Sequence, residues 1–141
     1  MSSYPAPASN FVPHDAPMVL IDEVLSHDKD AGTTARLSIS PTALFAAGDG
    51  VPGWVGIEYM AQCVAAHGGC EAREQGAEPA IGYLLGTRRY DSRLDVFPFG
   101  AELIVRAVPL FFEGSLGAFQ CSLEMDDEVV ASATINAFSP G

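Results

Sequence analysis

The sequence predicts an α+β fold in which one long helix is wrapped by a curved antiparallel sheet. Two observations support this prediction. A single helical segment of about 20 residues has apolar or small side chains on most of its sides, so it needs cover on most sides. The remaining segments are short, rich in β-branched residues, and separated by polar turns. One face of an antiparallel sheet can cover such a helix, which favours a two-layer arrangement.

Size and composition indicate one globular domain. The chain has 141 residues, of which 48% are apolar and 18% are charged. This length supports one hydrophobic core, and this balance is typical of folded rather than disordered chains. The first ten residues, MSSYPAPASN, combine small, polar and proline residues. We therefore expect a flexible arm over residues 1–10, followed by a single domain over residues 11–141.

Charge, hydropathy and cysteine usage exclude several classes of protein. The net charge of −11 argues against nucleic-acid binding, because affinity for phosphates depends on many lysines and arginines. No apolar run approaches the ~18 residues of a membrane span, and the N-terminus lacks the basic and apolar regions of a secretory signal. Three cysteines cannot all pair within the chain, and no CxxC motif occurs. These features favour a cytoplasmic location.

The segments before the long helix read as strands and turns. Two prolines within residues 12–17 predict a turn or a short irregular helix. Residues 18–25 and 35–39 are apolar, β-branched or alternating, and they predict two strands joined by a polar turn over residues 27–32. His27 falls in this acidic turn and is expected to be solvated. Further along, a capping serine followed by proline predicts a short helix at Ser40-Pro41, and a glycine-rich loop follows over residues 46–53.

The long helix is expected over residues 54–75, and its two faces differ in kind. One face is apolar and contains Met60, Cys63, Val64, His67 and Cys70, by the 3.6-residue period. The opposite face has small residues around one carboxylate and one amide, those of Glu58 and Gln62. A carboxylate in the second turn of a buried helix is costly unless it is paired or used, so Glu58 is a candidate functional residue.

Four strands are expected after the helix, and they complete the sheet. Their segments alternate or are rich in β-branched and aromatic residues, and tight turns with the sequences FPFG, EGS and MDDE separate them. They cover residues 81–90, 102–112, 116–125 and 129–138. The expected order is therefore two strands, one buried helix and four strands.

Two segments resemble the β-hydroxyacyl-acyl-carrier-protein (ACP) dehydratases. Residues 12–22, VPHDAPMVLID, are similar to the family's LPHRxPfLLvD segment. Residues 52–62, PGWVGIEYMAQ, are similar to the PGVLIxEAMAQ segment at the start of the family's central helix. The proline-glycine pair, the acid and the MAQ triplet all fall in register. The match looks closest to the dehydratase-like proteins of aryl polyene biosynthesis.

The resemblance implies both a fold and a reaction. Family members are hotdog folds that form dimers, with the long helices buried and the active sites at the subunit interface. They are hydro-lyases that remove water from a 3-hydroxyacyl thioester carried by ACP, giving a trans-2-enoyl thioester for fatty-acid-like or aryl polyene synthesis. No cofactor or metal is implied. The partners expected are ACP and a second hotdog subunit, which is either an identical chain or a different one.

The resemblance also assigns roles to three residues at the start of the long helix. Glu58 stands at the position of the catalytic acid, and Gln62 at that of the glutamine that braces the acid. Gly53 stands at the position of the glycine whose N–H group receives the thioester carbonyl. The chemistry fits these positions, because an N–H group at a helix N-terminus stabilises the enolate charge that develops when the α-proton leaves.

The sequence departs from the family at the second catalytic residue. The family's histidine lies in a GHFPGxP segment nine residues before the glycine, a position that Leu44 occupies here. His14, inside the first matched segment, is the remaining candidate base, although a histidine between prolines can also brace the turn through its backbone contacts. A non-catalytic subunit paired with a histidine-bearing partner, and a thioesterase, therefore remain alternatives.

Two further clusters of side chains have a possible function. Cys63, His67 and Cys70 fall at helical spacing and could face one metal ion, but no fourth ligand is evident and cysteines suit a packed helix face, so no metal site is expected there. Three of only seven basic residues lie close together: Arg88, Arg89 and Arg93. They either pair with nearby aspartates on a solvated edge or form a patch that receives the acidic carrier protein.

Overall fold

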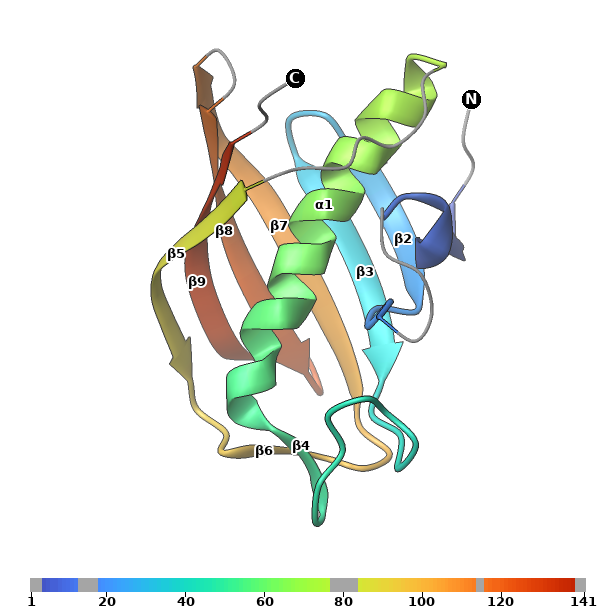
Figure 1. Ribbon diagram of the computed structural model, residues 1–141, viewed down its shortest axis with the longest axis vertical. Coiled ribbons are helices and arrows are strands. Elements are labelled where there is room, and N and C mark those ends of the chain that lie inside the picture. Colours follow the sequence, from blue (N-terminus) through green and yellow to red (C-terminus); the bar gives the residue numbers. More distant parts are fainter. Residues whose placement is uncertain (1–3, 13–17, 77–83, 114–115, 139–141) are drawn as a thin grey trace.

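The computed structural model describes residues 4–12, 18–76, 84–113 and 116–138 (Figure 1). Its main feature is a seven-stranded antiparallel sheet in the order β1-β2-β3-β7-β8-β9-β5. In chain order these strands are β1 (Ala6–Pro7), β2 (Glu23–Asp28), β3 (Gly32–Ser38), β5 (Leu84–Ser92), β7 (Glu102–Glu113), β8 (Leu116–Met125) and β9 (Glu128–Phe138). A second, two-stranded sheet pairs β4 (Gly50–Pro52) with β6 (Val96–Pro98).

One long helix, α1 (Gly56–Glu74), crosses one face of the large sheet (Figure 1). Two short 3₁₀ helices complete the structure, η1 (Ala8–Asn10) and η2 (Gly53–Val55), and η2 runs directly into α1. The helix ends at a glycine, since Gly76 adopts a left-handed φ of +76° and its N–H group donates to the carbonyl of Arg73 at 3.0 Å. No helix in the described part of the chain is long and apolar enough to cross a membrane. The α+β hotdog class predicted from the sequence is confirmed.

The core lies between the helix and the sheet. The helix face predicted to be apolar is buried along its whole length, with Met60, Cys63, Val64, His67 and Cys70 all exposed by 3% or less. On the sheet side, buried and partly exposed residues alternate along the central strands, as the period of two requires. The buried residues include Val105 of β7, Leu123 of β8 and Ile135 of β9.

The N-terminal residues correct one prediction. Residues 1–10 were expected to form a flexible arm, but Ala6 and Pro7 pair with Val24 and Glu23 of β2. Ala8 is completely buried, and a side chain on Gly69 of α1 would collide with the carbonyl oxygen of Phe11. The segment therefore covers part of the second face of the helix, and the composition of residues 1–10 concealed this packing. The prediction of a flexible arm is therefore wrong for residues 6–10.

Two other local predictions are also wrong. The strand before the turn starts later and runs further than expected, because β2 includes His27 and Asp28. The polar turn is therefore shorter than predicted, and the Asp28 carboxylate accepts the N–H groups of Asp30 and Ala31 within it. The Ser40-Pro41 pair starts a turn rather than a helix, since the Ser40 hydroxyl bonds to the side chain and the N–H group of Thr42.

Candidate active site at the start of the long helix

The small sheet and β5 hold the start of α1 in place. The N–H group of Gly53 donates to the carbonyl of Asp95 at 2.7 Å, and the Tyr90 hydroxyl of β5 donates to the carbonyl of Gly53 at 2.6 Å. A side chain on Gly53 would collide with the carbonyl oxygen of Leu94, so only glycine permits this close approach. For Gly53 to receive a thioester carbonyl, its bond to Asp95 would have to be exchanged. The next N–H group, that of Trp54, makes no backbone hydrogen bond outside its own helix within the described residues.

Glu58 lies in the first turn of α1 and is exposed. It forms no hydrogen bond or ion pair with any described residue. Trp54 lies one helical turn before it and is 60% exposed, so an acid and a large aromatic group stand next to each other on an open surface. Among the described residues, the Glu58 carboxylate therefore has no structural partner, which leaves it open to a substrate or to a second chain.

Gln62 is buried, and its side-chain amide forms hydrogen bonds with two backbone groups. Its side-chain carbonyl accepts the N–H group of Leu20 at 2.7 Å, and its amide nitrogen donates to the carbonyl of Met18 at 2.6 Å. No hydrogen bond joins Gln62 to Glu58 within the described residues. Gln62 thus fixes the segment that follows residues 13–17, and the bracing of the acid stays a prediction.

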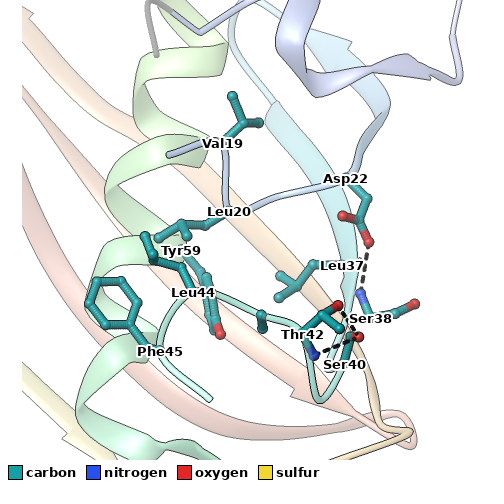
Figure 2. A pocket seen from close by; sticks show the side chains of 11 residues that line it. Val19, Leu20, Asp22, Leu37, Ser38, Ser40, Thr42, Leu44, Phe45 and Tyr59 are labelled. Carbon is teal, nitrogen blue, oxygen red and sulfur yellow. Dashed lines mark hydrogen bonds between the residues drawn. The ribbon is translucent and has the colours of Figure 1, made fainter. Parts of the chain in front are cut away.

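A cavity of about 290 Å³ opens beside this end of the helix (Figure 2). Ser38, Ser40 and Thr42 line one side of it, and Leu44, Phe45 and Tyr59 line the other. Burial raises the pKa of the Tyr59 phenol to about 12, so it stays neutral and can only donate or accept a hydrogen bond. Leu44 is 43% exposed, and its apolar side chain occupies the position at which the family's histidine is expected. This part of the chain therefore offers a pocket for a ligand, and Asp22 is its one acidic residue, but none of the described residues that line it is a histidine.

The two described histidines, His27 and His67, do not lie beside Glu58. His14 lies outside the described residues. His67 is nine residues further along the helix than Glu58, a separation of about 13 Å. His27 lies beside His67, with 4.7 Å between the ring centroids. Neither described histidine can therefore act together with Glu58 of the same chain.

His27 and His67 belong instead to a buried hydrogen-bonded chain of side chains. The Thr33 hydroxyl bonds to Nδ1 of His27 at 2.7 Å and to Nδ1 of His67 at 2.8 Å. Nε2 of His27 lies 2.5 Å from a carboxylate oxygen of Glu71. Burial lowers the pKa of His67 to about 4, so this imidazole is neutral near pH 7. The expectation that His27 is solvated is wrong, since its side chain is completely buried. His27 belongs to β2 and not to the polar turn after it.

The cysteines are part of the packed core. Cys63, Cys70 and Cys121 are buried, and the Cys63 thiol lies within bonding distance of the carbonyls of Thr33 and Val105. Burial raises the pKa of Cys70 to about 11 and that of Cys121 to about 12. In the described residues, Cys63, His67 and Cys70 do not form a group of metal ligands.

The arginine cluster lies on and just after β5. Arg89 forms an exposed ion pair with Asp91 at 2.9 Å, and Arg93 donates to the carbonyl of Val129 at 3.2 Å. The side chain of Arg88 is outside the described part of the chain. Arg89 thus has one of the acidic neighbours that the sequence suggested, and docking of a carrier protein stays a prediction.

Comparison with known proteins identifies the family. A sequence model of the ApeP-like family, described as ApeP dehydratase, matches residues 6–141. The chain belongs to the ApeP-like dehydratase family. No curated protein matches it.

Solved structures agree with this assignment. The dehydratase heterocomplex ApeI:P from Xenorhabdus doucetiae contains a chain that is 26% identical, with a TM-score of 0.89 over 96% of this chain and 92% of that one. The PaaI protein of E. coli is 14% identical, with a TM-score of 0.61 over 84% of this chain and 78% of that one. The TT0310 protein of Thermus thermophilus is 15% identical, with a TM-score of 0.61 over 82% and 88%. The last two share the fold of this ApeP-like protein.

Proposed function

We propose that this ApeP-like protein is one subunit of a 3-hydroxyacyl-ACP dehydratase, in which Glu58 acts with a histidine supplied by a second, different hotdog subunit. One observation carries the proposal. Glu58 is exposed at the start of α1 without a partner in the described residues, while Leu44 stands where the family's histidine is expected. The related ApeI:P structure is a heterocomplex, which supports pairing with another hotdog protein.

The proposed reaction needs one base and one acid. The partner's imidazole removes the proton from C2 of the substrate, and the electrons move onto the thioester carbonyl as an enolate. N–H groups at the start of the helix, with the positive end of its dipole, stabilise that charge. The enolate then reforms the carbonyl and expels the C3 hydroxyl, which takes a proton from the protonated Glu58 carboxyl. Water and a trans-2-enoyl thioester are the products, and the imidazolium returns its proton to Glu58 through solvent or substrate.

The position of β5 supports a subunit interface beside Glu58. β5 forms one edge of the large sheet and pairs only with β9 among the described strands (Figure 1). An edge strand presents unpaired N–H and carbonyl groups that can pair with a strand of another chain. Tyr90 of β5 is hydrogen-bonded to Gly53, so this edge is adjacent to the start of α1. A hotdog partner that pairs with β5 would cover Trp54 and Glu58 and bring its own residues to them.

Carrier-protein docking is a further part of the proposal. ACP is acidic, and this chain has a net charge of −11, so productive contact requires a local positive patch. Arg89 and Arg93 are exposed near the same edge, and Arg88 is next to them in the sequence. Replacing all three should weaken turnover of an ACP-linked substrate and leave turnover of a short thioester mimic nearly unchanged. Equal loss with both substrates would contradict docking.

The test is an assay of 3-hydroxyacyl-ACP dehydration by the chain alone and with a histidine-bearing hotdog partner. We expect enoyl product only in the presence of the partner. His14→Ala separates the alternatives, since the complex should keep its activity if the partner provides the base. Turnover by the chain alone that His14→Ala abolishes would instead make His14 the base. Release of free acid would show a thioesterase, and absence of turnover in the complex would contradict the proposal.

A further inference from the structure

A second group of chemically active side chains lies at the opposite end of α1 from Glu58. His27 of β2 and Glu71 and Glu74 of α1 bring one imidazole nitrogen and two carboxylates within 4.8 Å of one another. Nε2 of His27 is 2.5 Å from a Glu71 oxygen and 3.6 Å from a Glu74 oxygen. One nitrogen and two oxygens at such distances are a ligand set that zinc accepts.

The charge at this position favours a bound cation. Glu71 and Glu74 lie in the last turns of α1, where the helix dipole is negative and carboxylates are unfavourable. No lysine or arginine within the described ranges forms an ion pair with either carboxylate. The neighbouring Arg73 donates instead to the carbonyl of Asn10 and lies over the ring of Phe11. The carboxylates of Glu71 and Glu74 carry two negative charges beside the buried His27 imidazole. A divalent cation would balance both of these charges.

The side chains behind His27 hold it as a metal ligand is usually held. Its imidazole is completely buried, and Thr33 binds Nδ1, so Nε2 is presented to the two carboxylates. If Nε2 binds a metal, Nδ1 carries the proton and donates to Thr33, and the Thr33 hydroxyl then donates to Nδ1 of His67. This leaves the proton of His67 on Nε2, which has no hydrogen bond with any described residue.

A cavity of about 420 Å³ adjoins the cluster at Glu71, the one of its three side chains that lines the cavity. Glu71 and the buried His67 line it, together with Lys29, Asp30 and an apolar wall formed by Pro109, Leu110, Phe111 and Phe112. His67 is only 3% exposed and yet borders this space with an unpartnered nitrogen. A metal ion with three protein ligands keeps a fourth position for water or an anionic group, which would approach from the cavity side of Glu71.

We propose that His27, Glu71 and Glu74 form a binding site for a zinc-type divalent cation, with Thr33 as the residue that orients His27. The ion would take the place of the direct contact between His27 and Glu71. Ligands of a tetrahedral zinc ion are about 3.3 Å apart, so the Glu71 carboxylate must move by a little under 1 Å, which its 22% exposed side chain permits. The site is separate from Glu58 and does not depend on the proposed reaction.

The test is calorimetric titration of the chelator-treated full chain with ZnCl₂, together with its thermal unfolding. We expect saturable binding and a rise in Tm with zinc. Glu71→Gln and Glu74→Gln should each weaken binding by at least about tenfold, and Thr33→Val, which removes only the orienting hydroxyl, by about 10–100-fold. Glu74 is 36% exposed, so its replacement tests the site without disturbing the core.

Matched controls distinguish this site from others. Glu58→Gln removes a carboxylate from the same helix and His14→Ala removes a histidine, and both should bind zinc as the unaltered chain does. With Co²⁺ in place of zinc, a tetrahedral visible spectrum should appear and be lost in Glu71→Gln. Absence of saturable binding, unchanged affinity in Glu71→Gln and Glu74→Gln, or loss in His14→Ala would overturn the proposal.

Discussion

At the scale of single residues, the amide of Gln62 connects the long helix to the segment that carries His14. It accepts a hydrogen bond from the N–H group of Leu20 and donates one to the carbonyl of Met18, and both bonds are partly buried. Removing it leaves both backbone groups without a partner, and each such loss costs about 1–3 kcal/mol. The position of Met18 and Leu20 therefore depends on one side chain more than on local turn chemistry.

The variant Gln62→Met tests this dependence, because it keeps the size of the side chain and removes its hydrogen bonds. We expect the free energy of unfolding to fall by about 2–3 kcal/mol, measured by urea denaturation. Gln75→Met, at the exposed end of the same helix, is the control and should change stability by less than about 0.5 kcal/mol. Equal effects of the two substitutions would show that Gln62 does not anchor residues 18–20.

The burial of a side chain was predictable from the sequence where its residue belongs to a local pattern. The helical period placed Cys63 and His67 on the buried face, and both are buried. The contacts of Gln62 with residues 18 and 20, of Glu71 with His27 and of His67 with Thr33 join residues 34 to 44 positions apart. No local pattern contains such contacts, since they arise only when β2, β3 and α1 pack together.

At the scale of elements, the turn between β8 and β9 shows where local strain remains. Asp126 and Asp127 have φ angles of +53° and +65°, which are the angles of a two-residue hairpin turn that favours Asn-Gly. The MDDE segment was predicted to be a turn, and this is confirmed. Its aspartates occupy a conformation that glycine adopts without steric cost.

Asp127→Gly should therefore stabilise the protein by about 0.5–1 kcal/mol, seen as a higher midpoint in urea denaturation. The opposite change at the end of α1 is a matched control. Gly76 has a φ of +76° and open space around it, so Gly76→Ala should cost about 1 kcal/mol through backbone strain alone. A destabilised Asp127→Gly variant would show that the aspartate side chains stabilise the turn.

Element order and type followed from the sequence, while several boundaries did not. The predicted strand over residues 116–125 agrees with β8, because its alternation is clear and turns flank it on both sides. The strand β2 and the packed residues 6–10 were missed in part, since their sequences are polar or rich in proline and gain their structure from pairing along the sheet edge. Small paired segments such as β4 and β6 have too few residues to show any period.

At the scale of the whole molecule, the surface around Glu58 combines an exposed aromatic side chain with an exposed carboxylate. Trp54 is the only tryptophan in the sequence and is 60% exposed. A large exposed aromatic side chain beside an unpartnered carboxylate is typical of a surface that another subunit covers. The edge strand β5 lies next to the same surface, through Tyr90 and Gly53.

The fluorescence of Trp54 can therefore be used to detect subunit pairing. Its fluorescence emission should shift to shorter wavelength, and its quenching by acrylamide should decrease, when the hotdog partner is added. The partner's own tryptophans must be replaced or subtracted for this measurement. Trp54→Phe should remove the signal and leave the complex intact by size-exclusion chromatography. Emission that does not change in a complex shown to form would place the interface elsewhere.

The central claim is that this ApeP-like chain supplies the catalytic carboxylate of a dehydratase shared between two different subunits. The most direct measurement is the turnover number of the assembled complex with Glu58→Gln in place of the unaltered chain, using 3-hydroxyacyl-ACP. Because Glu58 is exposed and makes no bond within the described residues, the variant should fold and assemble normally. We predict that turnover falls by about a hundredfold or more. Turnover equal to that of the unaltered complex would contradict the claim.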